Sequence, residues 1–220
     1  MATYAAETTA VIAENATTTK ATKTTVTVTL DVWKLKAVAM AASRDETRFY
    51  LQGVYIDPRG VMVATNGHMA IACKVDVTAD KGFIIPLGLI DRIKPRKGVK
   101  FAVVELDGNV IKLNCNTETY YDQEIDGSFP DYVKALPRNF SGEQAYFIPS
   151  YLLVMQKAIA MSHGKAWSAK KISEALPHIT PNGSGPALVK GFTADMFGVL
   201  MPYKNPVEGG ETVPSWFSAL

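Results

Sequence analysis

Few side chains of the kind that usually perform catalysis occur in this sequence. Three histidines, His68, His163 and His178, could act as general bases beside a carboxylate. The run Asn66-Gly67-His68, however, is typical of a turn between strands, where small residues meet the demands of the backbone. We find no nucleophile elbow, HExxH motif, glycine-rich phosphate loop or carboxylate cluster of the kind that metal-dependent nucleases use. The sequence therefore predicts a protein that is not an enzyme.

The cysteines and the apolar runs indicate where the protein works. Cys73 and Cys115 are far apart, without a CxxC motif or a Cys/His cluster, so they favour neither a zinc site nor a disulfide framework. No apolar run approaches the roughly 18–20 residues that a membrane helix needs. The N-terminus has no basic region followed by an apolar one, so we expect no signal peptide. We expect a cytoplasmic protein with no cofactor and no membrane partner.

The basic residues suggest a second chemistry, the binding of phosphate groups. The chain has 23 Lys+Arg and 21 Asp+Glu, and this net charge of +2 by itself argues against a nucleic-acid partner. Yet segments 31–44, 86–100 and 149–171 hold 12 basic and 2 acidic residues, whereas the rest of the chain holds 11 and 19. The basic residues of these segments are Lys34, Lys36, Arg44, Arg92, Lys94, Arg96, Lys97, Lys100, Lys157, Lys165, Lys170 and Lys171.

The shared sign of these three segments is more informative than the charge of any one of them. A single basic helix is usually just a solvated face. Three basic segments in a repeated pattern instead predict a positive stripe that contacts phosphates in a salt-sensitive, sequence-independent way. We find no zinc finger, RNP-type aromatic pattern or helix-turn-helix spacing that would add base readout.

A pattern of one helix and four strands repeats three times and places each basic segment on a helix. In the first copy, alternating residues 24–30 predict a strand, and Asp31 is expected to cap a helix over 32–40. Each helix covers one face of a mostly antiparallel sheet, so the predicted class is α+β, built from βαβββ units. The other strands are expected at 49–56, 61–65, 69–75, 83–85, 99–105, 110–115, 120–125, 145–148, 172–179, 187–192 and 197–202, and the other helices from Pro86 to about 94 and from Pro149 to 161.

Four separated segments resemble the bacterial beta sliding clamp family, the processivity subunit of DNA polymerase III. Residues 44–54 and 63–68 are similar to its TRYYLNG and ATDGHRLA segments, residues 126–137 to DGRFPDYRRVLP, and residues 199–204 to VVMPMR. Their order and spacing match over about residues 24–204. The resemblance implies a DNA clamp fold with a complete clamp domain of two βαβββ halves at 24–142 and a half domain at 143–204. A flexible tail at 1–23 and a C-terminal tail at 205–220 remain outside it.

The resemblance also implies a function. The family forms a closed ring of six such domains, whose helices line a hole through which duplex DNA slides. The three basic helices would then face DNA, without sequence specificity, in a homo-oligomer. The pair Phe49-Tyr50 matches a loop pair that touches DNA near the ring edge; core packing is an equal alternative for Phe49.

A peptide pocket is implied as well. In the family, DNA polymerases and clamp loaders insert a short linear motif into a hydrophobic pocket between the central and final domains, and such pockets bind by burying a few apolar anchors. This chain departs from the family pattern at Asn66, Met69, Ala70 and Tyr203, so the sequence leaves its preferred motif open. Carried over residue by residue, the lining is Leu51, Thr65, Gly67, His68, Pro130, Lys134, Ala135, Val199, Met201, Pro202 and Tyr203.

The odd half domain leaves a second function open. The chain could be a clamp-fold adaptor that binds peptides, or competes for polymerase motifs, without closing a ring. If a ring of six domains forms, it needs four chains whose half domains pair. A further hypothesis is that the apolar run 213–220, with Trp216 and Phe217, folds back into the peptide pocket.

Overall fold

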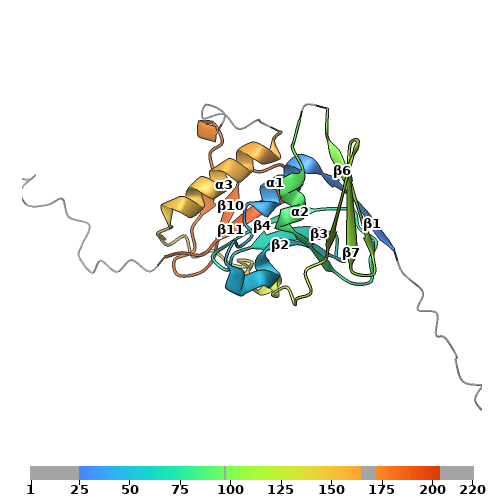
Figure 1. Ribbon diagram of the computed structural model, residues 1–220. Coiled ribbons are helices and arrows are strands. Elements are labelled where there is room, and N and C mark those ends of the chain that lie inside the picture. Colours follow the sequence, from blue (N-terminus) through green and yellow to red (C-terminus); the bar gives the residue numbers. More distant parts are fainter. Residues whose placement is uncertain (1–24, 97, 165–171, 204–220) are drawn as a thin grey trace, which may run out of the picture.

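The computed structural model describes residues 25–96, 98–164 and 172–203 (Figure 1). The predicted tails 1–23 and 205–220, including the Trp216-Phe217 run, lie outside these residues, as do Lys97, Lys165, Lys170 and Lys171. Two βαβββ units follow one another along the described chain, as the sequence predicts, and the third unit has the order αβββ because its predicted first strand is reduced to a bridge.

The first unit begins with strand β1 and helix α1. The predicted cap is confirmed, because the Asp31 carboxylate accepts hydrogen bonds from the backbone N–H groups of Trp33 (2.9 Å) and Lys34 (3.2 Å). The elements of this unit are β1 (Val26–Asp31), α1 (Val32–Ala39), the 3₁₀ helix η1 (Glu46–Leu51), β2 (Gly53–Asp57), β3 (Val61–Thr65) and β4 (Met69–Lys74).

The second unit follows the same order, and the third follows it from the helix onward. The second contains β5 (Phe83–Pro86), α2 (Leu87–Arg92), β6 (Phe101–Asp107), β7 (Val110–Cys115) and β8 (Glu118–Gln123), and is followed by the 3₁₀ helix η2 (Tyr132–Ala135). The third contains α3 (Pro149–Ser162), β9 (His178–Thr180), β10 (Ala187–Lys190) and β11 (Met196–Leu200).

Three local predictions were wrong. Phe49 to Leu51 lie in η1 and not in a strand, because Asp45 caps a 3₁₀ turn by accepting from Thr47 N–H at 3.0 Å. Residues 145–148 form a single bridge, between Tyr146 and Tyr203. Pro86 is the N-cap of α2 and not its first residue.

A fourth local prediction, the strand over 172–179, was also wrong in most of its length. Its first residues are helical, and Ala175 N–H donates to the carbonyl of Ile172 at 3.0 Å. Pro177 has no N–H for a sheet ladder, so the strand is confined to the residues after it.

The first two units are joined by an exchange of strands between their sheets. The four-stranded sheet has the order β1-β6-β7-β8, and the seven-stranded sheet has the order β5-β2-β3-β4-β11-β10-β9, with antiparallel neighbours throughout. β1 of the first unit therefore pairs with β6 of the second, and β5 of the second pairs with β2 of the first. The third unit extends the larger sheet through β4 and β11, from Met69↔Leu200 to Cys73↔Met196.

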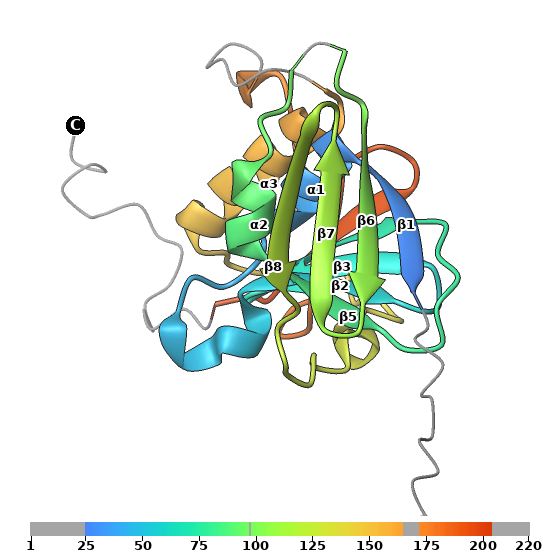
Figure 2. The ribbon, with the colours of Figure 1, turned by 45° about the vertical axis from the view of Figure 1, so that its right-hand side comes forward.

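Alternating side chains give the seven-stranded sheet two different faces. Met62 and Ile71 belong to the main core with Leu35 and Val38 of α1, and the three helices lie side by side over this face (Figures 1 and 2). Their sequence neighbours point the other way, since Val63 and Ala72 pack with Tyr132 of η2. The sheet thus separates a helix face from an outer face that carries residues 129–135.

Candidate functional site

The helix face holds a groove among the three helices. Its volume is about 570 Å³, and it brings together Lys36 and Arg44 from α1 and its exit, Asp91 from α2 and Lys157 from α3. Trp33, Ala39, Met40, Pro95, Val154 and Met161 form the rest of its lining. Three residues predicted to face DNA therefore meet in one place, although they are far apart in the sequence.

Ion pairs within the helix face reduce the charge available to a ligand. Lys36 lies 3.8 Å from the Asp91 carboxylate, and Arg44 lies 3.5 Å from the same group. Burial lowers the pKa of Lys36, and Asp91 partly offsets this effect. Arg44 remains largely exposed, so its guanidinium can contact phosphate more freely than the Lys36 ammonium.

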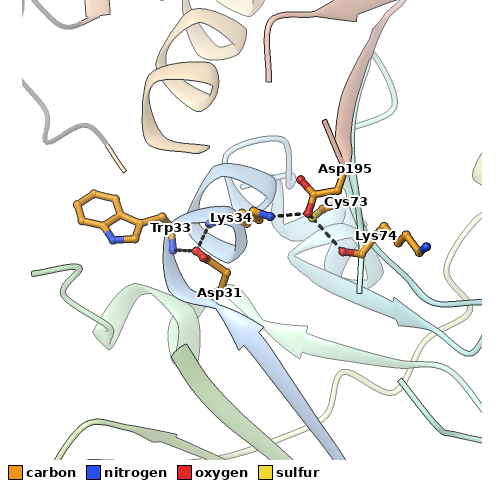
Figure 3. A network of polar contacts seen from close by, with 6 residues as sticks. All are labelled: Asp31, Trp33, Lys34, Cys73, Lys74 and Asp195. Atoms are coloured by element: carbon orange, nitrogen blue, oxygen red, sulfur yellow. Dashed lines mark hydrogen bonds and ion pairs between the residues drawn. The ribbon is translucent and has the colours of Figure 1, made fainter. Parts of the chain in front are cut away.

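Lys34 has a structural partner that the sequence did not reveal. Its ammonium pairs with the carboxylate of Asp195 in the loop between β10 and β11 (Figure 3). Burial acts to lower the pKa of Lys34, but the hydrogen bond and charge of Asp195 outweigh it and raise that pKa. We therefore leave Lys34 out of the proposed DNA surface and interpret it as a contact between the first and third units.

Cys73 and Lys74 complete this contact. Lys74 N–H donates to the carbonyl of Asp195 at 2.9 Å. The Cys73 thiol lies 3.9 Å from the Asp195 carboxylate and 3.3 Å from the Lys74 carbonyl oxygen (Figure 3). Burial raises the pKa of the Cys73 thiol to about 12, so it stays protonated. The network joins α1, β4 and the β10–β11 loop, and it supports the sheet pairing of β4 with β11.

The remaining predicted DNA contacts divide into two groups. Arg92, Lys94 and Arg96, in α2 and its exit, are exposed. Arg96 also lines a second groove with Trp33 and Lys100. Lys97, Lys165, Lys170 and Lys171 lie outside the described residues, so their positions remain predictions.

The aromatic pair of η1 is oriented toward solvent. Phe49 is 53% exposed, so the alternative that it packs in the core is wrong. Tyr50 is half-buried and meets the Phe49 ring edge to face, with centroids 5.7 Å apart. Their DNA contact remains a prediction, since no contact in the structure tests it.

The outer face brings the first part of the predicted peptide pocket to the end of the third unit's last strand. Thr65 donates from its hydroxyl to the carbonyl of Met69 at 2.7 Å and accepts from Gly67 N–H at 3.1 Å. This turn presents the carbonyl of His68, which accepts from Met201 N–H at 2.8 Å. The turn between β3 and β4 therefore lies directly beside Met201.

Strand register places Val199, one apolar member of the predicted pocket, on the outer face. Val199 lies opposite Ala70 and Phe197 opposite Ala72, so Val199 shares the face on which Phe197 packs with Val63 and Ala72. Met201 and Tyr203 are exposed beyond the end of β11, whereas Leu51 and Val199 are buried. Pro202 is half-buried between Met201 and Tyr203. The His68 ring stacks on Tyr151 of α3, with centroids 5.8 Å apart.

A buried carboxylate holds residues 129–135 against this face. Asp57 accepts from the Tyr132 hydroxyl at 3.0 Å and from Arg59 Nε at 2.9 Å. The hydrogen bonds from Arg59 and Tyr132 outweigh burial and lower the pKa of Asp57. Pro130, Lys134 and Ala135 are exposed around this anchor, and Lys134 pairs with Asp131 at 3.4 Å.

Sequence reasoning missed Asp57, Arg59 and Asp195. Asp57 and Arg59 stand in a Pro-Gly turn, where polar residues need no further explanation, although an acidic residue two positions from an arginine could have suggested a pair. Nothing in the sequence links Asp195 to Lys34, because their contact depends on the pairing of β4 with β11.

The described residues contain neither a cluster of metal ligands nor a membrane-spanning helix. No group of three or more His, Cys, Asp or Glu side chains that could hold a metal ion occurs in them. None of the helices described is long and apolar enough to cross a membrane.

Comparison with known proteins relates this geometry to one family. No family model matches the chain. The beta sliding clamp of Escherichia coli K12 is 29% identical over 119 residues, which are 48% of this chain and 31% of that protein. The Rickettsia bellii beta sliding clamp is 31% identical over 122 residues, which are 50% of this chain and 32% of that protein. The chain is a relative of the bacterial beta sliding clamps.

Solved structures extend the similarity to most of the chain. The beta subunit of DNA polymerase from Streptococcus pyogenes has a TM-score of 0.58 at 15% identity, covering 81% of this chain and 66% of that one. The Bartonella birtlesii sliding clamp, whose structure has griselimycin bound, has a TM-score of 0.56 at 16% identity and covers 82% of this chain and 66% of that one. The fold is thus a DNA clamp fold, and the sequence matches span about a third of the curated relatives.

Proposed function

We propose that this chain is a DNA sliding clamp, a non-catalytic accessory subunit that encircles duplex DNA and raises the processivity of a DNA polymerase. The observation that carries the proposal is the separation of two surfaces by the seven-stranded sheet. Basic side chains gather on the helix face, whereas Val199 and residues 129–135 of the candidate peptide pocket belong to the outer face. A protein that must slide on DNA while it holds a second protein needs such opposed surfaces.

On the helix face, Arg44, Arg92, Lys94 and Arg96 are the exposed cations that we assign to the phosphate backbone. Lys157 extends the same surface along α3 through the groove. Contacts of this kind are weak, mobile and salt-dependent, which suits a ring that retains DNA by topology. We further propose that residues 24–142 form a complete clamp domain and residues 143–204 a half domain.

On the outer face, we propose that a short linear motif of a DNA polymerase or clamp loader binds beside the turn at Gly67 and His68. Met201 and Tyr203 would supply the exposed apolar anchors, while Thr65 and the buried Val199 form the floor. Residues 129–135, held by Tyr132 on Asp57, would form the opposite wall. The alternative function, a peptide-binding adaptor that closes no ring, uses this surface alone.

Charge reversal on each face tests the DNA surface. Replacing Arg92 and Arg96 by Glu should weaken the binding of duplex DNA and flatten its salt dependence, because each phosphate contact contributes a slope of roughly 0.9 in log K against log salt. The matched control replaces Lys74 and Lys190, which are exposed on the outer face of the same sheet. Fluorescence anisotropy with labelled duplex measures both. Equal losses for the two double variants would contradict the proposed DNA surface.

A further inference from the structure

The segment before helix α3 in the third unit is equivalent to the segment before helix α2 in the second unit. The helices begin after the N-caps Pro86 and Ile148, and the residues two positions earlier are Ile84 and Tyr146. Each of these two residues accepts a backbone hydrogen bond from a residue that follows its own unit's last strand, at 3.2 Å for Ile84 and 2.7 Å for Tyr146. The two segments are therefore equivalent, and their surroundings can be compared position by position.

Unit one covers these positions in unit two. Ile84 lies in β5, which pairs with β2, and it is 2% exposed. A Cβ atom added to Gly53 of β2 would lie 2.4 Å from Cγ2 of Ile84, so the two strands are in close contact. Tyr146, the equivalent of Ile84 in the third unit, is by contrast 50% exposed.

The same difference runs through the helices and strands that follow. Leu87 and Ile90 of α2 are buried, whereas their equivalents Pro149 and Leu152 of α3 are exposed and half-buried. The strand after each helix is β2, β6 and β9 in the three units. β2 and β6 each have two neighbours, but within the described residues β9 pairs with β10 alone. The third unit therefore exposes the edge and the apolar side chains that join the first two units.

The fifth residue after each helix N-cap indicates which partner can cover the exposed surface of the third unit. The fifth residue after each N-cap is Lys36 in α1, Asp91 in α2 and Leu153 in α3. Lys36 and Asp91 meet at 3.8 Å across the contact between the first two units, so equivalent positions face each other there. A contact between two copies of the third unit would bring Leu153 against Leu153.

We propose that the described part of the third unit, residues 145–164 and 172–203, is a dimerisation surface whose partner is the same unit of a second copy. Each copy would lay its segment 145–148 along β9 of the other, as β5 lies along β2 and β1 along β6. Because both copies are identical, the pairing is a two-fold contact with Leu153 at its axis. This inference rests on the fold alone and stands whether or not the protein encircles DNA.

The apolar character of Leu153, the residue at the proposed axis, supports a second copy of the chain as the partner. A charged side chain there would meet its own like charge, which is unfavourable, whereas the Lys36–Asp91 pair works only between two different units. Leu153 is 46% exposed and apolar, so it is self-complementary. Such a dimer has one complete domain at its centre and one at each end.

The mass in solution without DNA tests the dimer. Sedimentation at micromolar concentration should give twice the 23.9 kDa of the chain. Leu153→Glu places two carboxylates at the axis and should raise the dissociation constant roughly a hundredfold. Val110→Glu, at an exposed position of β7, is the matched control and should keep the wild-type mass. A wild-type monomer would overturn the proposal, and so would an unchanged mass for Leu153→Glu.

A charge-swap experiment locates the axis itself. Leu153→Glu and Leu153→Lys proteins should each be monomeric, and an equimolar mixture should restore the dimer, because it recreates the Lys36–Asp91 arrangement. Failure of the mixture to dimerise would place the contact elsewhere. A larger even assembly whose mass Leu153→Glu halves also supports the proposal.

A cross-linking variant tests the same contact without a charged side chain, in case the Leu153→Glu and Leu153→Lys proteins misfold. Leu153→Cys should be joined between copies by a short bismaleimide, whereas Val110→Cys should not, and the native Cys73 and Cys115 are buried. If removal of residues 205–220 were needed before any dimer formed, the C-terminal segment would be the occupant of this face and the proposal would be wrong.

Discussion

Tyr132 is the best position at which to test how residues 129–135 are held on the outer face. Its buried hydroxyl donates to Asp57 at 3.0 Å, and burial together with Asp57 raises the pKa of Tyr132 to about 12, so the hydroxyl remains a donor. Tyr132→Phe removes this hydrogen bond and leaves the ring in place. A hydrogen bond to a charged acceptor contributes about 1.5–3 kcal/mol, so we expect a loss of about 2 kcal/mol in the free energy of unfolding.

The effect should depend on pH in a defined direction. The pKa of Asp57 is lowered from its ordinary value of 3.8, first by the hydrogen bonds of Arg59 and further by Tyr132. A lowered pKa in the folded state means that the carboxylate stabilises the fold fully above about pH 5, and that this stabilisation is lost as the pH falls through the folded pKa. The difference between wild type and Tyr132→Phe should therefore shrink toward about 1 kcal/mol in acid, the contribution of a neutral hydrogen bond.

Urea denaturation of both proteins between pH 7 and pH 3 measures this difference. Tyr121→Phe is the control, because Tyr121 is 59% exposed on β8 and its loss should change stability by less than about 0.5 kcal/mol. A destabilisation by Tyr132→Phe that equals the control would refute the anchoring role of Asp57.

Three further predictions concern the other contacts. Asp195→Asn should lower the free energy of unfolding by about 1 kcal/mol, because its pair with Lys34 is partly exposed, while the exposed Asp80→Asn should not; chemical denaturation compares them. Met201→Ala with Tyr203→Ala should weaken binding of the proposed polymerase linear-motif peptide about tenfold or more in isothermal titration without changing DNA affinity, and equal binding would contradict the pocket. Cys73, with its thiol pKa raised to about 12, should resist a thiol reagent at pH 8 until the protein is unfolded; rapid labelling of native protein would contradict this.

The sequence predicted those features of the fold that depend on local patterns. Alternation and capping residues located β3 and β7 at their observed bounds, and Asp31 fixed the start of α1. Segment 145–148 and residues 172–177 were misjudged because a strand needs a partner as well as β-branched residues, and no local pattern reports whether a partner is present.

The candidate site was predictable to a similar degree. The family motifs marked His68 and Met201, which the structure brings together through one backbone hydrogen bond. The count of basic residues marked Lys34, but not its ion pair with Asp195, because the two lie on different units and meet only through the sheet. Charge in a sequence thus indicates a surface, whereas the fold decides which charges remain available.

The central proposal, that the chain encircles DNA, is tested most directly by topology. Dilute subunits are allowed to assemble with a nicked circular plasmid, and the complex is separated from free protein by gel filtration before and after a single cut linearises the plasmid. A ring should stay with the circle and slide off the linear molecule, since its phosphate contacts are weak. Equal retention on both forms, or retention on neither, would contradict a sliding clamp and favour the peptide-binding adaptor.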